Sequence, residues 1–186
     1  MAPARTVRRP VRIAAKPIED LTVGVDALLV AGNDAAFRDF VADLFAASSS
    51  MVSVRRALGR ATGLSGSEIA MLLAIRRLSP EGNVGIRAIA EHLHVAGPHV
   101  TMEIGKLAEA GLVTKRISAS DSRAIDIRLT PEGRRRLRQL TPLVRAANDV
   151  LFAGMTEVEM AHVHRFLRRI VAGSAKAADA VDTARA

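Results

Sequence analysis

Polar side chains gather on one face of a short helix that the sequence predicts after Gly97 and Pro98. Proline suits a first helical turn, because the N–H that it lacks would be unpaired there. Val100, Ile104 and Leu107 recur at helical spacing and would be buried. The other side would present His99, Thr101, Met102, Glu103 and Lys106. Glu103 is acidic and is set aside. The other four, together with Gly97 and Pro98 at the start of the helix, form a candidate surface for contacting base edges in the major groove of DNA.

A basic ribbon with a polar tip follows this helix. Residues 113–117 and 125–129 alternate apolar and polar side chains, a pattern typical of half-buried strands. Arg123 in the intervening turn could enter the minor groove, and Asp121 could orient it by a charge-assisted hydrogen bond. The basic residues of the first strand would contact phosphates, which fixes register without reading sequence. The candidate DNA-binding residues of the ribbon are Lys115, Arg116, Ser120, Asp121, Ser122 and Arg123.

A helix at residues 86–93, apolar at positions 86, 89, 90 and 93, precedes these elements. Helix, turn, helix and ribbon in this order predict a winged helix-turn-helix, in a fold that is mainly α with a small antiparallel β wing. The charge agrees: the chain carries +8, and residues 113–138 hold eight basic and three acidic residues. Such clustering indicates double-stranded DNA as the partner.

Long helices are predicted on both sides of this unit. The first runs from Asp34 to about Leu58, with apolar residues at positions 37, 40, 41, 44 and 45. Ser65 and Glu68 form a capping box that opens a second helix, which ends near Leu78. Residues 83–85 could add a short third strand to the wing.

Two more helices are predicted after the ribbon. Thr130 would cap the first at its N-terminus, and Pro142 should bend or divide it. Thr156 and Glu159 form a second capping box, and Gly173 is a plausible stop for the helix that follows. The residues of this last helix expected to point inward are Met160, Val163, Leu167, Ile170 and Val171.

The N-terminal segment is a basic arm. It carries five basic residues before the first acid, and its prolines argue against a long helix. The arm is either a disordered, solvated tail or a flexible segment that adds phosphate contacts. The chain thus divides into an arm (1–20), a first helical region (21–60), the winged unit (61–130), two further helices (131–173) and an alanine-rich tail (174–186), which continues the helix or frays.

Several of these motifs together resemble the MarR-type regulators, a family of winged-helix transcription regulators, over roughly residues 34–172. The motifs are Leu64–Glu68, Ala88–Leu93, Val100-Thr101, Leu107–Val113, Asp121–Arg123 and Leu129–Gly133. The resemblance implies a homodimeric regulator, most often a repressor, that binds an inverted-repeat operator and is held together by its N- and C-terminal helices. Met102, where the family often has a basic residue, and Gly105 in mid-helix depart from the pattern, so the operator sequence is not carried over.

The resemblance also implies a small-molecule effector, often an aromatic acid or a phenol, between the dimer helices and the DNA-reading unit. The candidate residues on those segments are Ser49, Arg55, Met71 and His94. Arg55 could pair with a carboxylate, although a solvated arginine on a helix face is the commoner situation. A cytoplasmic, nucleoid-associated location in a bacterium or archaeon is expected for such a regulator.

Other chemistry has little support in the sequence. There is no cysteine, and no phosphate-binding glycine loop or nucleophile motif, so we expect neither an enzyme nor a cofactor. The pairs at positions 92/94 and 162/164 put two histidines two residues apart, whereas helical zinc pairs favour a spacing of four, and no metal site is expected. No apolar run is long enough to span a membrane. Two alternatives stay open: an architectural nucleic-acid-binding protein and a metal-responsive regulator of the same fold.

Overall fold

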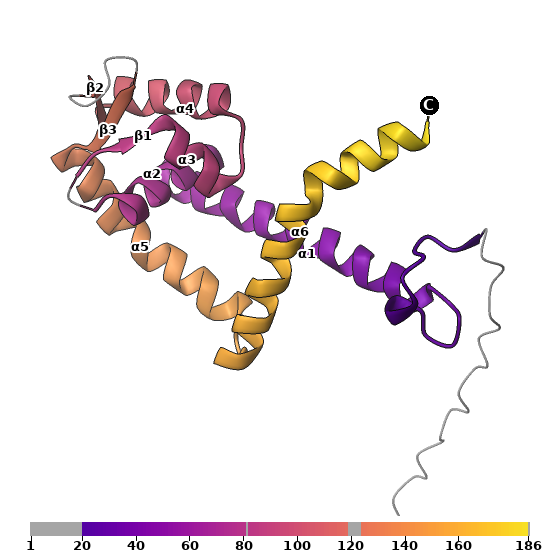
Figure 1. The fold of residues 1–186 in the computed structure, drawn as a ribbon. Helices are drawn as coiled ribbons and strands as arrows, with labels where there is room; N and C mark the ends of the chain where they lie inside the picture. Colours follow the sequence, from indigo (N-terminus) through magenta and orange to yellow (C-terminus); the bar gives the residue numbers. More distant parts are fainter. Residues whose placement is uncertain (1–19, 81, 119–123, 186) are drawn as a thin grey trace, which may run out of the picture.

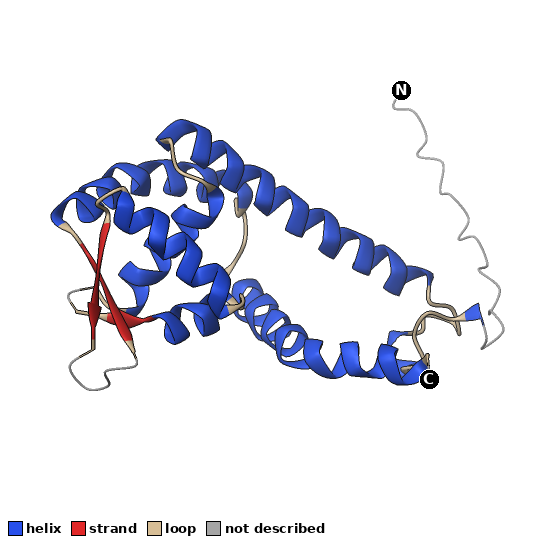
Figure 2. Ribbon diagram, turned by 90° about the horizontal axis from the view of Figure 1, so that it is seen from above, coloured by secondary structure: helices blue, strands red, loops and turns tan. Residues whose placement is uncertain are grey.

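The structure, a computed structural model, describes residues 20–80, 82–118 and 124–185 (Figure 1). The chain forms a winged unit at one end, from which long helices extend (Figure 2). The elements are η2 (Asp26–Leu28), α1 (Ala35–Thr62), α2 (Gly66–Leu78), β1 (Val84–Gly85), α3 (Ile86–Leu93), α4 (Gly97–Glu109), β2 (Val113–Ile117), β3 (Ile125–Leu129), α5 (Pro131–Leu151) and α6 (Glu157–Ala184). The described elements are mostly helical with a small antiparallel sheet, as the sequence predicted.

The sheet has the order β1-β3-β2, and both pairings are antiparallel. Val84 pairs with Ile127, which confirms the predicted third strand, and Val113 pairs with Leu129. The half-buried pattern holds for β3 but is wrong for β2, where all residues after Val113 are exposed and Ile117 is 73% exposed. The reason is position in the sheet, since β2 is the edge strand and only the central strand lies fully over the core.

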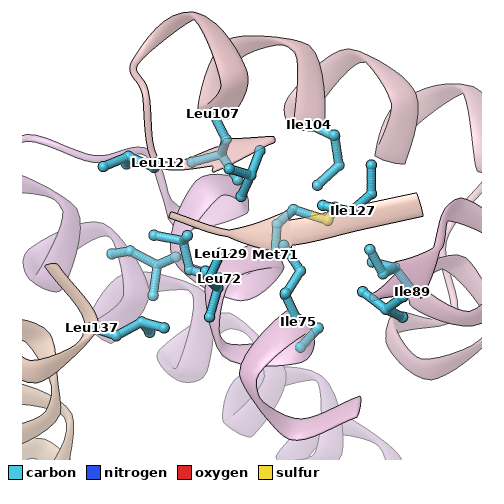
Figure 3. Packing of buried hydrophobic residues seen from close by; sticks show 14 of the residues in the cluster. Met71, Leu72, Ile75, Ile89, Ile104, Leu107, Leu112, Ile127, Leu129 and Leu137 are labelled. Carbon is cyan, nitrogen blue, oxygen red and sulfur yellow. The ribbon is translucent and has the colours of Figure 1, made fainter. Parts of the chain in front are cut away.

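The core is shared by α2, α3, α4, the sheet and the start of α5 (Figure 3). Its apolar side chains interlock from all of these elements, so the winged unit buries its own apolar surface without help from another chain. The fully buried residues labelled in Figure 3 include Met71, Leu72, Ile75, Ile89, Ile104, Leu107 and Ile127.

A threonine–glycine corner joins the wing to α5. Thr130 caps α5 by accepting a hydrogen bond from the Gly133 amide at 3.0 Å, as predicted, and its hydroxyl donates to the Gly111 carbonyl at 2.7 Å. A Cβ atom at Gly133 would overlap the Leu112 carbonyl oxygen, so this position requires glycine. Gly111 ends the preceding helical turn with φ +69°, a conformation that glycine adopts freely.

Hydrogen bonds and an ion pair at Asp34 fix the start of α1. Asp34 is fully buried, and its Oδ2 accepts hydrogen bonds from the amide and hydroxyl of Thr22 at 2.8 and 2.7 Å. Arg38 adds an ion pair to Oδ1 at 3.0 Å. The helix then continues to Thr62, beyond the predicted end near Leu58, and stops at Gly63 with φ +70°.

Pro142 lies inside α5 without dividing it, which excludes one of the two outcomes predicted for it. The last helix differs from the prediction in two ways. Gly173 does not stop α6, which runs on to Ala184, so the alanine-rich tail is helical. The side chains expected to point inward, Met160, Val163, Leu167, Ile170 and Val171, are all exposed in the single chain.

The two long helices meet where α6 crosses α1. There Phe40 and Phe166 make an edge-to-face contact with their ring centroids 5.5 Å apart. Within the described ranges, no helix is both long and apolar enough to cross a membrane.

Candidate nucleic-acid interface

A tight turn between α3 and α4 sets the orientation of α4 relative to α3. His94 ends α3 in the left-handed conformation, with φ 52°. The chain is extended again at Ala96, and α4 begins with Gly97 and Pro98, as the sequence predicted. Val100, Ile104 and Leu107 are completely buried in the core. The opposite face of α4 is therefore held outward by its own packing.

The outward face of α4 carries the predicted reading residues. Thr101, Met102 and Lys106 are exposed, and His99 is half-buried. Positions 99, 102 and 106 follow helical spacing and form one stripe along the helix. Thr101 is exposed, and its hydroxyl donates to the Gly97 carbonyl at 3.1 Å, so the hydroxyl oxygen can still accept a hydrogen bond. Met102 is 53% exposed and offers an apolar contact of the kind that a thymine methyl group accepts.

Glu103 is not on the exposed side, where the sequence analysis placed it. Its side chain is only 4% exposed, and its Oε1 accepts a 2.7 Å hydrogen bond from the Lys106 ammonium. This bond raises the pKa of Lys106 above its ordinary value. Helical spacing could have indicated the burial, because Glu103 lies three residues after Val100 and four before Leu107.

The wing presents cations beside α4. Lys115 and Arg116 are exposed on β2, opposite Ile127 and Asp126 of β3. Because the edge strand is open to solvent, both side chains can reach a phosphate backbone. The predicted tip residues Ser120, Asp121, Ser122 and Arg123 lie outside the described residues.

Two arginines at the start of α5 are basic residues near the wing that have protein partners. Arg134 donates to the Pro80 carbonyl at 2.7 Å. Arg135 pairs with Glu132 through two hydrogen bonds, of 2.7 and 2.6 Å, which lower the pKa of the Glu132 carboxyl. These arginines secure the start of α5 in the free protein, so β2 supplies the more available cations.

The comparisons with known proteins agree with this geometry. Residues 64–125 match the sequence model of the MarR family. These residues form a MarR-family domain. They contain α2, α3, α4 and β2, so the winged helix that the motifs suggested is of the MarR type, the fold of a family of transcription regulators.

Relatives with known names are regulators as well. The HTH-type transcriptional repressor Rv2887 of Mycobacterium tuberculosis is 26% identical over 98 residues, which cover 53% of this chain and 70% of the repressor. The structure of CouR from Rhodococcus jostii, bound to p-coumaroyl-CoA, matches with a TM-score of 0.63 and 25% identity over 72% of this chain and 93% of that one. The MarR regulator of Oenococcus oeni matches with a TM-score of 0.63 and 16% identity, over 71% and 98% of the two chains.

The four predicted effector residues do not come together in one place. Arg55 lines a cavity of about 370 Å³ between α1, α2, α3 and α5. His94 instead lines a separate cleft of about 750 Å³ beside β1 and the start of β3. Met71 is 1% exposed in the winged core, and Ser49 is exposed on α1 outside the lining of the Arg55 cavity. Arg55 is therefore the candidate that the geometry favours.

The cavity at Arg55 is lined by three further polar residues that were not predicted as effector contacts. Arg77 of α2 and His92 of α3 lie in its lining, with Asn148 of α5. No local motif links these positions, since they come from separate helices. In the part of the chain that the structure describes, no three histidine or acidic side chains are grouped so that they could hold a metal ion.

Proposed function

We propose that this protein is a homodimeric repressor that binds an inverted-repeat operator and releases it when a small anionic molecule binds. The observation that carries the proposal is the outward stripe of α4 beside the cations of β2, on a winged unit whose core is closed. A helix fixed in this way can enter the major groove while the edge of the wing follows the adjacent backbone.

The dimer is supported by the helices outside the winged unit. No residue of α6 is buried, although the helix carries an apolar stripe, and Phe45 of α1 is 70% exposed. Apolar surface of this extent is uncommon on a monomer and is typical of a subunit interface. A second copy related by two-fold symmetry would cover the same surface on both chains, and the operator would be a pseudo-palindrome.

The effector class is supported by the lining of the cavity at Arg55. Its walls are aliphatic, with Val54, Leu58 and Leu73 among them, and Arg55 and Arg77 are the cations beside them. The described residues of this lining include no acidic side chain. A ligand with an apolar body and a carboxylate, such as an aromatic acid, would match both features.

The position of the cavity links ligand binding to DNA release. Its walls come from α1 and α5 as well as from α2 and α3 of the winged unit. A ligand releases DNA only if it binds the DNA-incompetent arrangement more tightly, and a site between these helices can distinguish two arrangements.

Selection of duplexes from a random-sequence pool tests the DNA-binding part of the proposal. The protein should enrich an inverted repeat and hold it against excess nonspecific DNA. An architectural protein would instead enrich no sequence, and that result would overturn the proposal.

A thermal-shift screen of aromatic acids tests the effector. A ligand that raises the melting temperature should also weaken operator binding. Arg55→Ala should reduce ligand affinity about tenfold while operator binding is retained. Arg60→Ala, on the same helix but outside the lining of the cavity, is the matched control. Equal ligand affinity in Arg55→Ala and wild type would remove Arg55 from the site.

A further inference from the structure

A buried carboxylate lies directly behind the DNA-reading stripe of α4. The Glu103 side chain is 4% exposed, and it holds Lys106, whose side chain is 50% exposed, through a 2.7 Å ion pair. The second carboxylate oxygen, Oε2, is buried and has no hydrogen-bond partner in the described part of the protein. Among the described residues, the polar partner of this carboxylate is therefore the lysine at the edge of the reading stripe.

The energetics of burial make this contact hard to break. An ionised carboxylate away from water is strongly unfavourable unless it is paired, and removing one partner of such a pair costs more than the pair itself contributes. If Lys106 swung out into solvent, Glu103 would lose this ion-pair partner. The lysine is therefore held on the surface of α4, and it loses most of the rotamer freedom that an exposed lysine normally has.

Lys106 is also the cation that α4 contributes to the interface. Within residues 97–109, all of which the structure describes, it is the one lysine or arginine. It follows His99 and Met102 on the same stripe. An ammonium group has three N–H donors, and the bond to Glu103 uses one of them. Two donors remain for DNA, and their position is defined before DNA arrives.

We propose that Glu103 is a positioning residue for sequence reading, which fixes the Lys106 ammonium as a donor to the major-groove acceptors of a guanine, O6 and N7. The proposal rests on the proposed operator binding, and it adds to it a specific source of base preference. A flexible lysine could contact phosphates as easily as bases, and phosphate contacts carry no sequence information. A tethered lysine makes its contact only where an acceptor meets it.

Base preferences of four proteins test this inference. The probe is the duplex that wild type enriches from a random pool, together with a set in which each base pair of one half-site is changed. Glu103→Gln keeps the shape and removes the charge. It should reduce the affinity difference between bases at one or two G·C pairs by about tenfold. It should also steepen the salt dependence of nonspecific binding, since the freed lysine can contact a phosphate. Lys106→Met should flatten the same positions, and the double variant should match Lys106→Met.

Two further variants guard the interpretation. Glu103→Leu also frees the lysine but fills the buried site with an apolar side chain, so it should fold even if Glu103→Gln is destabilised, and it should flatten the same positions. Glu91→Gln is the matched control, because it breaks the 2.7 Å pair of Glu91 with Arg87 on α3 with the same change in charge. It should leave every base preference within about twofold of wild type.

The outcomes separate this inference from the proposed function. If wild type enriches an operator and the folded Glu103 variants keep all of its base preferences, the positioning role is wrong and operator binding stands. If Glu103→Gln flattens preferences equally in the Lys106→Met background, Glu103 acts through the fold and not through Lys106, which also overturns the inference. If wild type itself shows no base preference, both the inference and the proposed function fail.

Discussion

The winged unit and the long helices differ in how much of their apolar surface is buried. In the winged unit, side chains from α2, α3, α4 and β3 fill a common core with almost no exposure (Figure 3). In α6 no residue is buried, although the helix is 28 residues long and carries an apolar stripe. The first region buries its apolar side chains in one chain, whereas the second leaves its apolar stripe exposed.

This difference assigns separate tasks to the two regions. A closed unit can hold α4 rigidly for reading, because rigid elements place side chains more accurately than loops do. The long helices, if they pair with those of a second copy, can set the distance between two winged units. The cavity at Arg55 lies between helices of both regions, where a ligand could change their relation.

The largest effect is expected from an acid in the apolar stripe of α6. Ile170→Asp should convert the dimer to a monomer and lower operator affinity by roughly 10²- to 10⁴-fold, since the two half-sites would no longer be bound together. Sedimentation and operator titration measure the two effects. Ala172→Asp, which puts the same acid on the opposite side of α6, is the control. A dimer that survives Ile170→Asp would place the interface elsewhere.

A cavity in the closed core should destabilise the winged unit directly. Leu72 is fully buried, and Leu72→Ala should lower the free energy of unfolding by about 2–5 kcal/mol. Ile170→Ala removes a similar side chain from the open stripe and should cost clearly less at concentrations where the protein is monomeric. Denaturant titrations compare the two variants. Equal losses would show that α6 is covered within one chain.

Single contacts to DNA come next in size. His99→Ala or Thr101→Ala should change which operator variants are bound, by about 1–3 kcal/mol for each lost base contact. Arg123→Ala, at the predicted tip of the wing, should weaken binding more evenly and most strongly at A·T-rich flanks, where the minor groove is narrow. Asp121→Ala should act in the same way but more mildly. Binding to a panel of half-sites and flanks measures these patterns, and unchanged binding by Arg123→Ala would refute the predicted role of the tip.

The smallest effect is expected from the basic arm. Deleting residues 1–18 should leave thermal stability unchanged, since the segment lacks an apolar period. If the arm contacts two or three phosphates, the slope of log K against log salt should fall by about 2–3. Titrations at several salt concentrations provide the slope, and an unchanged value would mean that the arm does not touch DNA.

Local patterns predicted the winged unit well. The strands at 113–117 and 125–129 and the start of α4 at Gly97 were predicted at their observed bounds, because period, capping residues and turn residues all agree there. The threonine of the corner at Thr130 was also recognised as a helix cap. The edge position of β2 depends on which strand pairs with β1, and its own sequence does not contain that information.

The errors lie where two local signals compete. Gly173 costs α6 only about 1 kcal/mol relative to alanine, and the strong helix formers after it offset this cost, so the helix continues. At Pro142, for which a bend or a division was predicted, division is excluded because α5 continues through it. The burial of Glu103 was missed because a charged residue was expected to be exposed, although its helical position is on the buried side. The place of Arg77 in the cavity lining depends on packing between helices distant in sequence.

A footprint on the selected operator tests the central claim most directly, because it reports the DNA-reading units and their spacing together. If two winged units are set by a dimer of the long helices, hydroxyl-radical cleavage should show two protected half-sites related by two-fold symmetry. Their centres should lie about one helical turn, roughly 10 base pairs, apart. Protection of a single half-site, or uniform protection without symmetry, would contradict the account.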